Sequence, residues 1–112
     1  MKQRSIPYAL AAAVLLGAGP ALAADMPPLA KKSGCTACHA IDHKVVGPAW
    51  MDVAKRYAGD AGAKDTLVNR VKTGGKGNWT EVTGGVPMPP YSPRVSDADI
   101  EQLVDFVLSL AK

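Results

Sequence analysis

The clearest periodic pattern of apolar residues lies at the C-terminal end of the chain. Ser96, with Asp99 three positions later, is typical of a helix N-cap, and acidic residues near the start suit the positive end of a helix. Apolar residues then recur at intervals of three and four, which predicts one buried face of a helix. They are Ile100, Leu103, Val104, Val107, Leu108 and Ala111.

Two segments in the middle of the chain also have helical patterns. Between Ala63 and Thr73 the apolar positions recur at helical spacing, and two glycines at 74 and 75 predict the stop. An apolar-rich stretch over residues 49–58 follows a Gly-Pro turn and predicts one or two helical turns that end at Gly59.

A short first helix is expected near the Pro27-Pro28 pair, because proline is tolerated in a first turn. We expect Asp25 to cap this helix and Gly34 to turn the chain out of it. No segment alternates as a strand does, so the predicted fold class is all-α. Residues 75–95 carry four prolines and several glycines, which predicts one long loop without regular structure.

Residues 1–23 are typical of an export signal. Lys2 and Arg4 precede an apolar run over residues 8–18, and the Ala-Leu-Ala sequence at 21–23 matches a cleavage site. The run is shorter than the roughly 20 apolar residues that a membrane span needs. We therefore expect cleavage after Ala23, a periplasmic protein, and one domain over residues 24–112.

Charge adds little to this picture. The whole chain has 13 Lys and Arg against 10 Asp and Glu, a net charge of +3. Removal of the leader with Lys2 and Arg4 leaves +1, so the balance does not indicate a nucleic-acid partner.

The chemistry of the chain is concentrated in residues 35–39, Cys-Thr-Ala-Cys-His. This C-x-x-C-H sequence is the attachment signature of c-type haem. On a helical turn, Cys35, Cys38 and His39 share a face, so two thiols can form thioethers with a porphyrin while the imidazole reaches its iron.

Other interpretations of the two cysteines are weaker. A thioredoxin-like C-x-x-C needs a surrounding α/β pattern, which is missing here. A zinc site needs more paired ligands than two cysteines and two histidines at these spacings. The second histidine, His43, is expected on the surface.

Three methionines beyond the leader compete for the sixth position of a haem iron: Met26, Met51 and Met88. Met26 and Met51 lie in or beside predicted helices, where methionine is usually core filler. Met88 lies in the sequence V-P-M-P-P over residues 86–90, where prolines reduce the entropy lost when a ligand loop is ordered. The sequence favours Met88.

These motifs together resemble the small bacterial class I cytochromes c of the c-551/c-552 kind. The resemblance rests on residues 32–59, on the Gly-Asn-Trp sequence at 77–79 and on the Pro-Met-Pro-Pro sequence at 87–90. It implies an all-α single-domain fold wrapped around one covalently attached haem c.

The resemblance also implies roles for individual residues. Cys35 and Cys38 are the thioether attachment points, and His39 and Met88 are the axial iron ligands. The carbonyl of Pro48 accepts a hydrogen bond from the other His39 nitrogen.

Arg70 and Trp79 match positions that bond a haem propionate in the family. The chain departs from the pattern at Tyr91, where the family often has Asn, and in the loop over residues 80–86, which is slightly long.

The implied function is one-electron transport without enzymatic activity. Electrons pass from a membrane cytochrome complex to a nitrite reductase, terminal oxidase or peroxidase, through brief docking of a monomer. Lysines in the first two-thirds of the chain either steer such partners or are ordinary solvated charges: Lys31, Lys32, Lys44, Lys72 and Lys76.

Three other functions remain open at this point. They are a ligand-binding haem protein with a vacant sixth position, a thiol-disulfide enzyme, and a fixed subunit of a larger enzyme.

Overall fold

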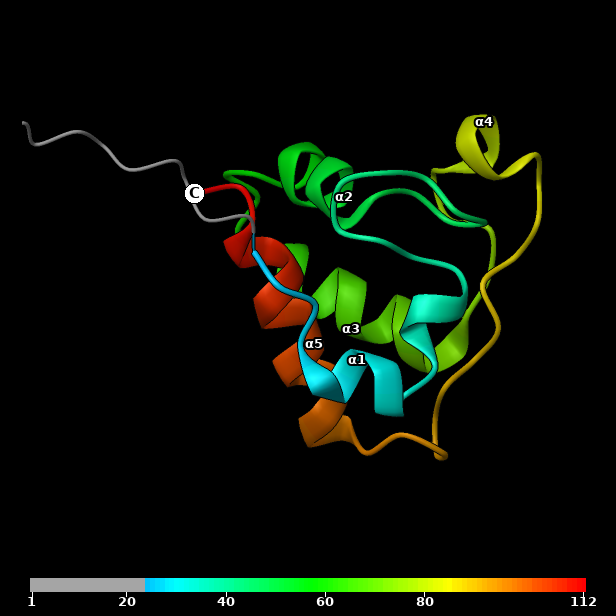
Figure 1. The fold of residues 1–112 in the computed structure, drawn as a ribbon, viewed down its shortest axis with the longest axis vertical. Coiled ribbons are helices and arrows are strands. Elements are labelled where there is room, and N and C mark those ends of the chain that lie inside the picture. Colours follow the sequence, from blue (N-terminus) through cyan, green and yellow to red (C-terminus); the bar gives the residue numbers. More distant parts are fainter. Residues whose placement is uncertain (1–23) are drawn as a thin grey trace, which may run out of the picture.

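The computed structural model describes residues 24–112 (Figure 1). The predicted leader and its cleavage after Ala23 lie outside these residues. The element order is α1 (Pro28–Lys32), a 3-10 turn η1 (Cys35–Ala37), α2 (Trp50–Arg56), α3 (Ala63–Thr73), α4 (Thr80–Thr83) and α5 (Asp97–Ser109). The described part contains isolated backbone bridges but no strand, so the predicted all-α class is confirmed. None of its helices has the length and apolar character needed to cross a bilayer.

α1, α2 and α3 all pack on α5. Its N-cap is Ser96, whose hydroxyl accepts a 3.2 Å hydrogen bond from the Asp99 amide, as predicted. α3 lies along α5 in Figure 1, and two ion pairs, Lys64 with Asp105 and Lys72 with Asp97, link the helices at 3.1 and 3.2 Å. Both pairs are solvent-exposed and therefore stabilise the contact only weakly.

α1 corrects one prediction, because Asp25 does not cap it. The N-cap position is Pro27, and no side chain bonds to the first turn. Pro28 occupies the first turn without an N–H to satisfy, and the Ala30 amide donates to the Pro27 carbonyl at 2.9 Å. Ala30 itself is fully buried, so α1 is fixed by packing.

α2 and α4 differ in part from the sequence-based predictions. α2 forms within the predicted stretch 49–58 and makes about two turns, as expected, but it ends at Arg56 and not at Gly59, and a turn closed by the Asp60 amide on the Tyr57 carbonyl follows it. Residues 75–95 are not wholly irregular, since α4 forms within them. The Trp79 carbonyl accepts from the amides of Val82 and Thr83, and Gly84 at φ +66° ends this helix. α4 projects at one end of the molecule (Figure 1).

The core has two clusters of buried side chains, and α5 contributes to both. One joins α1, η1 and α2 to α5, and the other joins α5 to the segment after Met88. The first cluster contains Ala30, Cys35, Trp50, Val53, Leu103 and Val107, and the second contains Tyr91, Val95, Ile100 and Val104.

Ile100→Ala tests the importance of the second cluster. Ile100 has no exposed surface, so truncation leaves a cavity and should lower the free energy of unfolding by about 2–5 kcal/mol. Val45→Ala is the control, because Val45 is 42% exposed, and we expect a change below about 1 kcal/mol. Guanidinium denaturation of the intact protein measures both. Equal changes would contradict the assignment of Ile100 to the core.

Candidate haem-binding site

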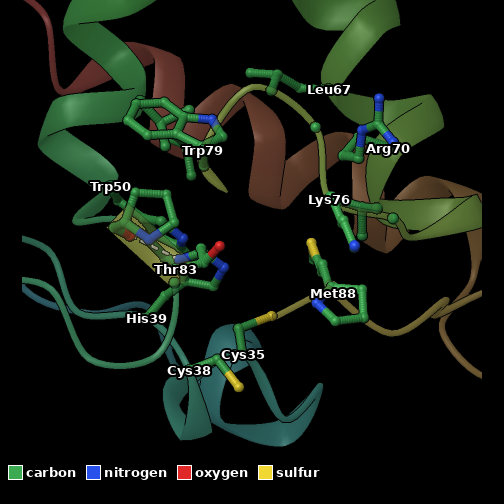
Figure 2. Close-up of a pocket in the computed structure, with 18 of the residues that line it drawn as sticks. Cys35, Cys38, His39, Trp50, Leu67, Arg70, Lys76, Trp79, Thr83 and Met88 are labelled. Atoms are coloured by element: carbon green, nitrogen blue, oxygen red, sulfur yellow. Dashed lines mark hydrogen bonds between the residues drawn. The ribbon is translucent and has the colours of Figure 1, made fainter. Parts of the chain in front are cut away.

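A cavity of about 550 Å³ lies between η1, α2, α3, α5 and the segment that carries Met88. All seven site residues named from the sequence line it: Cys35, Cys38, His39, Pro48, Arg70, Trp79 and Met88. Figure 2 shows the two cysteines at its lower edge, His39 and Met88 on opposite sides, and Trp79 and Arg70 across from the cysteines. Met26 and Met51 border a separate groove.

A tight turn brings Cys35 and Cys38 to this cavity. Gly34 at φ +84° leads the chain out of α1, and the His39 amide donates to the Cys35 carbonyl at 3.0 Å. Burial is the main cause that raises the pKa of the Cys35 thiol, although its own backbone hydrogen bond opposes the shift. A buried, protonated thiol is a poor nucleophile, which disfavours a thiol-disulfide enzyme.

The ring of His39 is oriented by a hydrogen bond to Pro48. The two atoms, His39 Nδ1 and the Pro48 carbonyl oxygen, lie 2.8 Å apart, and because a carbonyl only accepts, Nδ1 carries the proton. Burial lowers the pKa of His39, and the Pro48 contact partly offsets this. The imidazole is therefore neutral near pH 7, and its Nε2 lone pair is available to a metal.

Gly47 permits the close approach of backbone to the His39 ring. A Cβ at position 47 would lie 2.6 Å from His39 Cε1, too close for any side chain. The Gly47 amide donates to the Cys38 carbonyl at 2.8 Å, which holds this segment against the C-x-x-C-H turn. The local sequence gives no sign of this role, because a Gly-Pro pair indicates only a turn.

The backbone of Met88 is anchored to the end of α3. Met88 and Gly75 exchange two hydrogen bonds of 2.9 Å, and a Cβ at Gly74 would lie 2.5 Å from the Met88 carbonyl oxygen. Gly74 and Gly75 end α3, as predicted, and also admit the Met88 segment. That second role had no signal in the local sequence.

Arg70 and Trp79 are each held in place by polar contacts. Arg70 Nη1 donates to the Gly74 carbonyl at 3.1 Å, which holds the guanidinium against the turn after α3. Arg56 lies over the Trp79 ring, 3.7 Å from its centroid, and Nη1 of Arg56 donates to the Asn78 carbonyl at 2.6 Å. Arg56 was not identified from the sequence.

Tyr91 and His43 have different positions relative to the cavity. Tyr91 is buried, packs in the cluster that Met88 joins, and lies beneath the Arg94 guanidinium at 4.9 Å. His43 does not line the cavity. It is exposed, as predicted, and its ring pairs with Asp42 at 2.8 Å, which lowers the pKa of that carboxyl group.

These donors fit a c-type haem. Two free thiols, a neutral imidazole and a thioether surround a mostly apolar cavity, and the N–H groups of Arg70 and Trp79 lie on the side away from the cysteines. Among residues 24–112, no three His, Cys, Asp or Glu side chains gather to hold a metal ion, so the zinc interpretation is not supported.

Comparisons with known proteins agree with this chemistry. The family model of cytochrome c matches residues 18–111. Cytochrome c-551 of Allochromatium vinosum is 54% identical over 82 residues, 73% of this chain and 82% of that protein. Cytochrome c-551 of Pseudomonas aeruginosa is 47% identical over 109 residues, 97% of this chain and 98% of that protein.

A solved structure is similar as well. The crystal structure of Nitrosomonas europaea cytochrome c552 has a TM-score of 0.66 and 46% identity, and covers 73% of this chain and 95% of that one. These matches confirm the resemblance to the c-551/c-552 proteins, the class I cytochrome c fold and haem c as the cofactor. The chain belongs to the cytochrome c family of haem-based electron carriers.

Proposed function

We propose that this protein is a periplasmic one-electron carrier whose haem is attached through Cys35 and Cys38 and ligated by His39 and Met88. One observation carries the proposal: an imidazole and a thioether face each other across a cavity that two thiols border (Figure 2). The basic start and the apolar run of residues 1–23 support export, which suits a c-type cytochrome.

His39 and Met88 would have different roles: the contacts of His39 fix its orientation, and the thioether of Met88 affects the reduction potential. The bound haem supplies a one-electron change at its iron. His39 presents Nε2, because Nδ1 is committed to Pro48. The soft thioether of Met88 favours the ferrous state, which raises the reduction potential. With both positions filled, no site is left for a substrate, so the protein acts as a carrier and not as an enzyme.

The surroundings of the cavity suit a buried redox centre. The ring centroid of Trp50 lies 5.9 Å from that of His39 and 5.9 Å from that of Phe106. A row of aromatic side chains therefore extends from the imidazole to α5. Arg70 and Trp79 supply N–H donors on the side away from the cysteines, where the propionates of the haem would be met.

Partner docking would use the exposed residues at the mouth of the cavity. Val46 and Val86 line it and are 40% and 49% exposed, and the exposed Lys76 lines it as well. Exposed apolar side chains and a basic side chain at the cavity suit weak, brief contact between a monomer and acidic redox partners. Candidates are a membrane cytochrome complex as donor, and a nitrite reductase, terminal oxidase or peroxidase as acceptor. Lys72 is less available, because it pairs with Asp97.

Visible spectroscopy tests the function directly. Protein expressed with haem-attachment machinery should keep its haem after denaturing extraction. The native ferric form should show a weak far-red band, and the ferrous form should not bind carbon monoxide. Ready binding of carbon monoxide without that band would indicate a ligand-binding haem protein. Absence of covalent haem would indicate thiol chemistry.

Met88→Ala should leave the haem attached but open the iron to external ligands. Loss of the thioether should abolish the far-red band, lower the midpoint potential and permit binding of carbon monoxide. Met51→Ala is the control, since Met51 does not line the cavity. If the Met88 variant kept the band, Met88 would not be the iron ligand.

Gly47→Ala should disturb His39 while the rest of the chain stays folded. The added Cβ would press on the imidazole at 2.6 Å and displace Nδ1 from Pro48. We expect a lower yield of haem-loaded protein and altered His39 ring resonances in NMR spectra. Gly62→Ala is a matched control, because its nearest contact would be an ordinary 3.5 Å. Unchanged His39 resonances in the Gly47 variant would contradict the close approach.

A further inference from the structure

Arg56, at the C-terminal end of α2, reaches a segment more than twenty residues further along the chain. Its guanidinium carbon lies 3.7 Å from the centroid of the Trp79 ring, and Nη1 donates to the Asn78 carbonyl at 2.6 Å. One charged group therefore holds the plane of the indole and the backbone immediately before it. A stacked guanidinium with a directed N–H bond fixes orientation better than a point charge.

The segment that Arg56 holds has few other restraints. Within the described chain, the bond from Arg56 is the one hydrogen bond made by the backbone of residues 76–78. Gly75 and Gly77 have φ values of +119° and +55°, so the backbone here is intrinsically permissive. The segment nevertheless lines the cavity through Lys76, Asn78 and Trp79.

The position of Trp79 matters because its indole forms part of the cavity wall. Figure 2 shows Trp79 across from the two cysteines, on the side where Arg70 also lies. Arg56 does not line the cavity itself. It stacks on the Trp79 ring, which does line the cavity, so the indole is in direct contact with the Arg56 charge. Any effect of Arg56 on the redox centre must pass through Trp79 or through space.

We propose that Arg56 is a positioning residue for electron transfer, which holds the Trp79 indole in the cavity wall and raises the reduction potential of the centre. This rests on the proposed function. A positive charge close to the cavity favours the reduced iron, which carries one positive charge fewer than the oxidised iron. The same contact limits movement of the indole N–H.

Three variants of the haem-loaded protein test this role. Arg56→Gln removes the charge and the stacked guanidinium. Arg56→Lys keeps the charge but loses the planar group. Lys55→Gln is the matched control, because it removes a charge from the neighbouring exposed position of α2. The readouts are hydrogen exchange of the Trp79 indole N–H by NMR, with the buried Trp50 as internal reference, and the midpoint potential.

We expect Arg56→Gln to accelerate indole exchange about fivefold to tenfold and to lower the potential. Arg56→Lys should accelerate exchange but keep most of the potential. Lys55→Gln should leave exchange unchanged and lower the potential less than Arg56→Gln does. The proposal requires both effects of Arg56→Gln, and absence of either overturns it. Failure of the proposed function has another signature, the loss of covalent haem or of the far-red band in the unmodified protein.

Discussion

The site depends first on the close contact between the His39 ring and the turn at Gly47 and Pro48. The Pro48 carbonyl fixes the proton on Nδ1, and Gly47 leaves room for the ring to lie against backbone. The amides of Val46 and Gly47 donate to the Cys38 carbonyl, so the same turn also holds the C-x-x-C-H segment. The residues proposed for attachment and ligation thus form one structural unit, and the same backbone contacts fix the position of the imidazole.

On the side of the cavity opposite His39, backbone hydrogen bonds also hold Met88 in place. Its paired hydrogen bonds to Gly75 tie the loop to the end of α3, and the Tyr91 amide donates to the Val71 carbonyl three residues later. α3 packs on α5, which contributes buried residues to both core clusters. The two walls of the cavity are therefore connected through one helix. Since the cavity is largely apolar, a haem inside it completes the core of a small domain.

Sequence patterns predicted the parts of this structure that are local or carry a specific motif. α3 and α5 have regular apolar spacing, and Ser96 caps α5 as expected, because both signals act within one or two turns. The C-x-x-C-H motif identified Cys35, Cys38 and His39, and all three line the cavity. In contrast, α4 arises in a segment rich in helix breakers, and the contact of Arg56 with Trp79 joins positions distant in sequence. Neither has a local pattern that could reveal it.

The backbone hydrogen bonds and the packing of Met88 help to distinguish a ligand-binding haem protein from an electron carrier. A ligand-binding haem protein needs a sixth position that empties easily, whereas a carrier needs both ligands to stay in place when the electron arrives. Here the backbone is restrained at Met88 itself, by its paired hydrogen bonds with Gly75, and three residues later, where the Tyr91 amide donates to the Val71 carbonyl. Rotation of the Met88 side chain away from the cavity would separate it from the cluster of Tyr91 and Val104, and a larger movement of the loop would also break the paired bonds at Gly75. The cost of that opening favours a closed site, which is the arrangement that electron transfer requires.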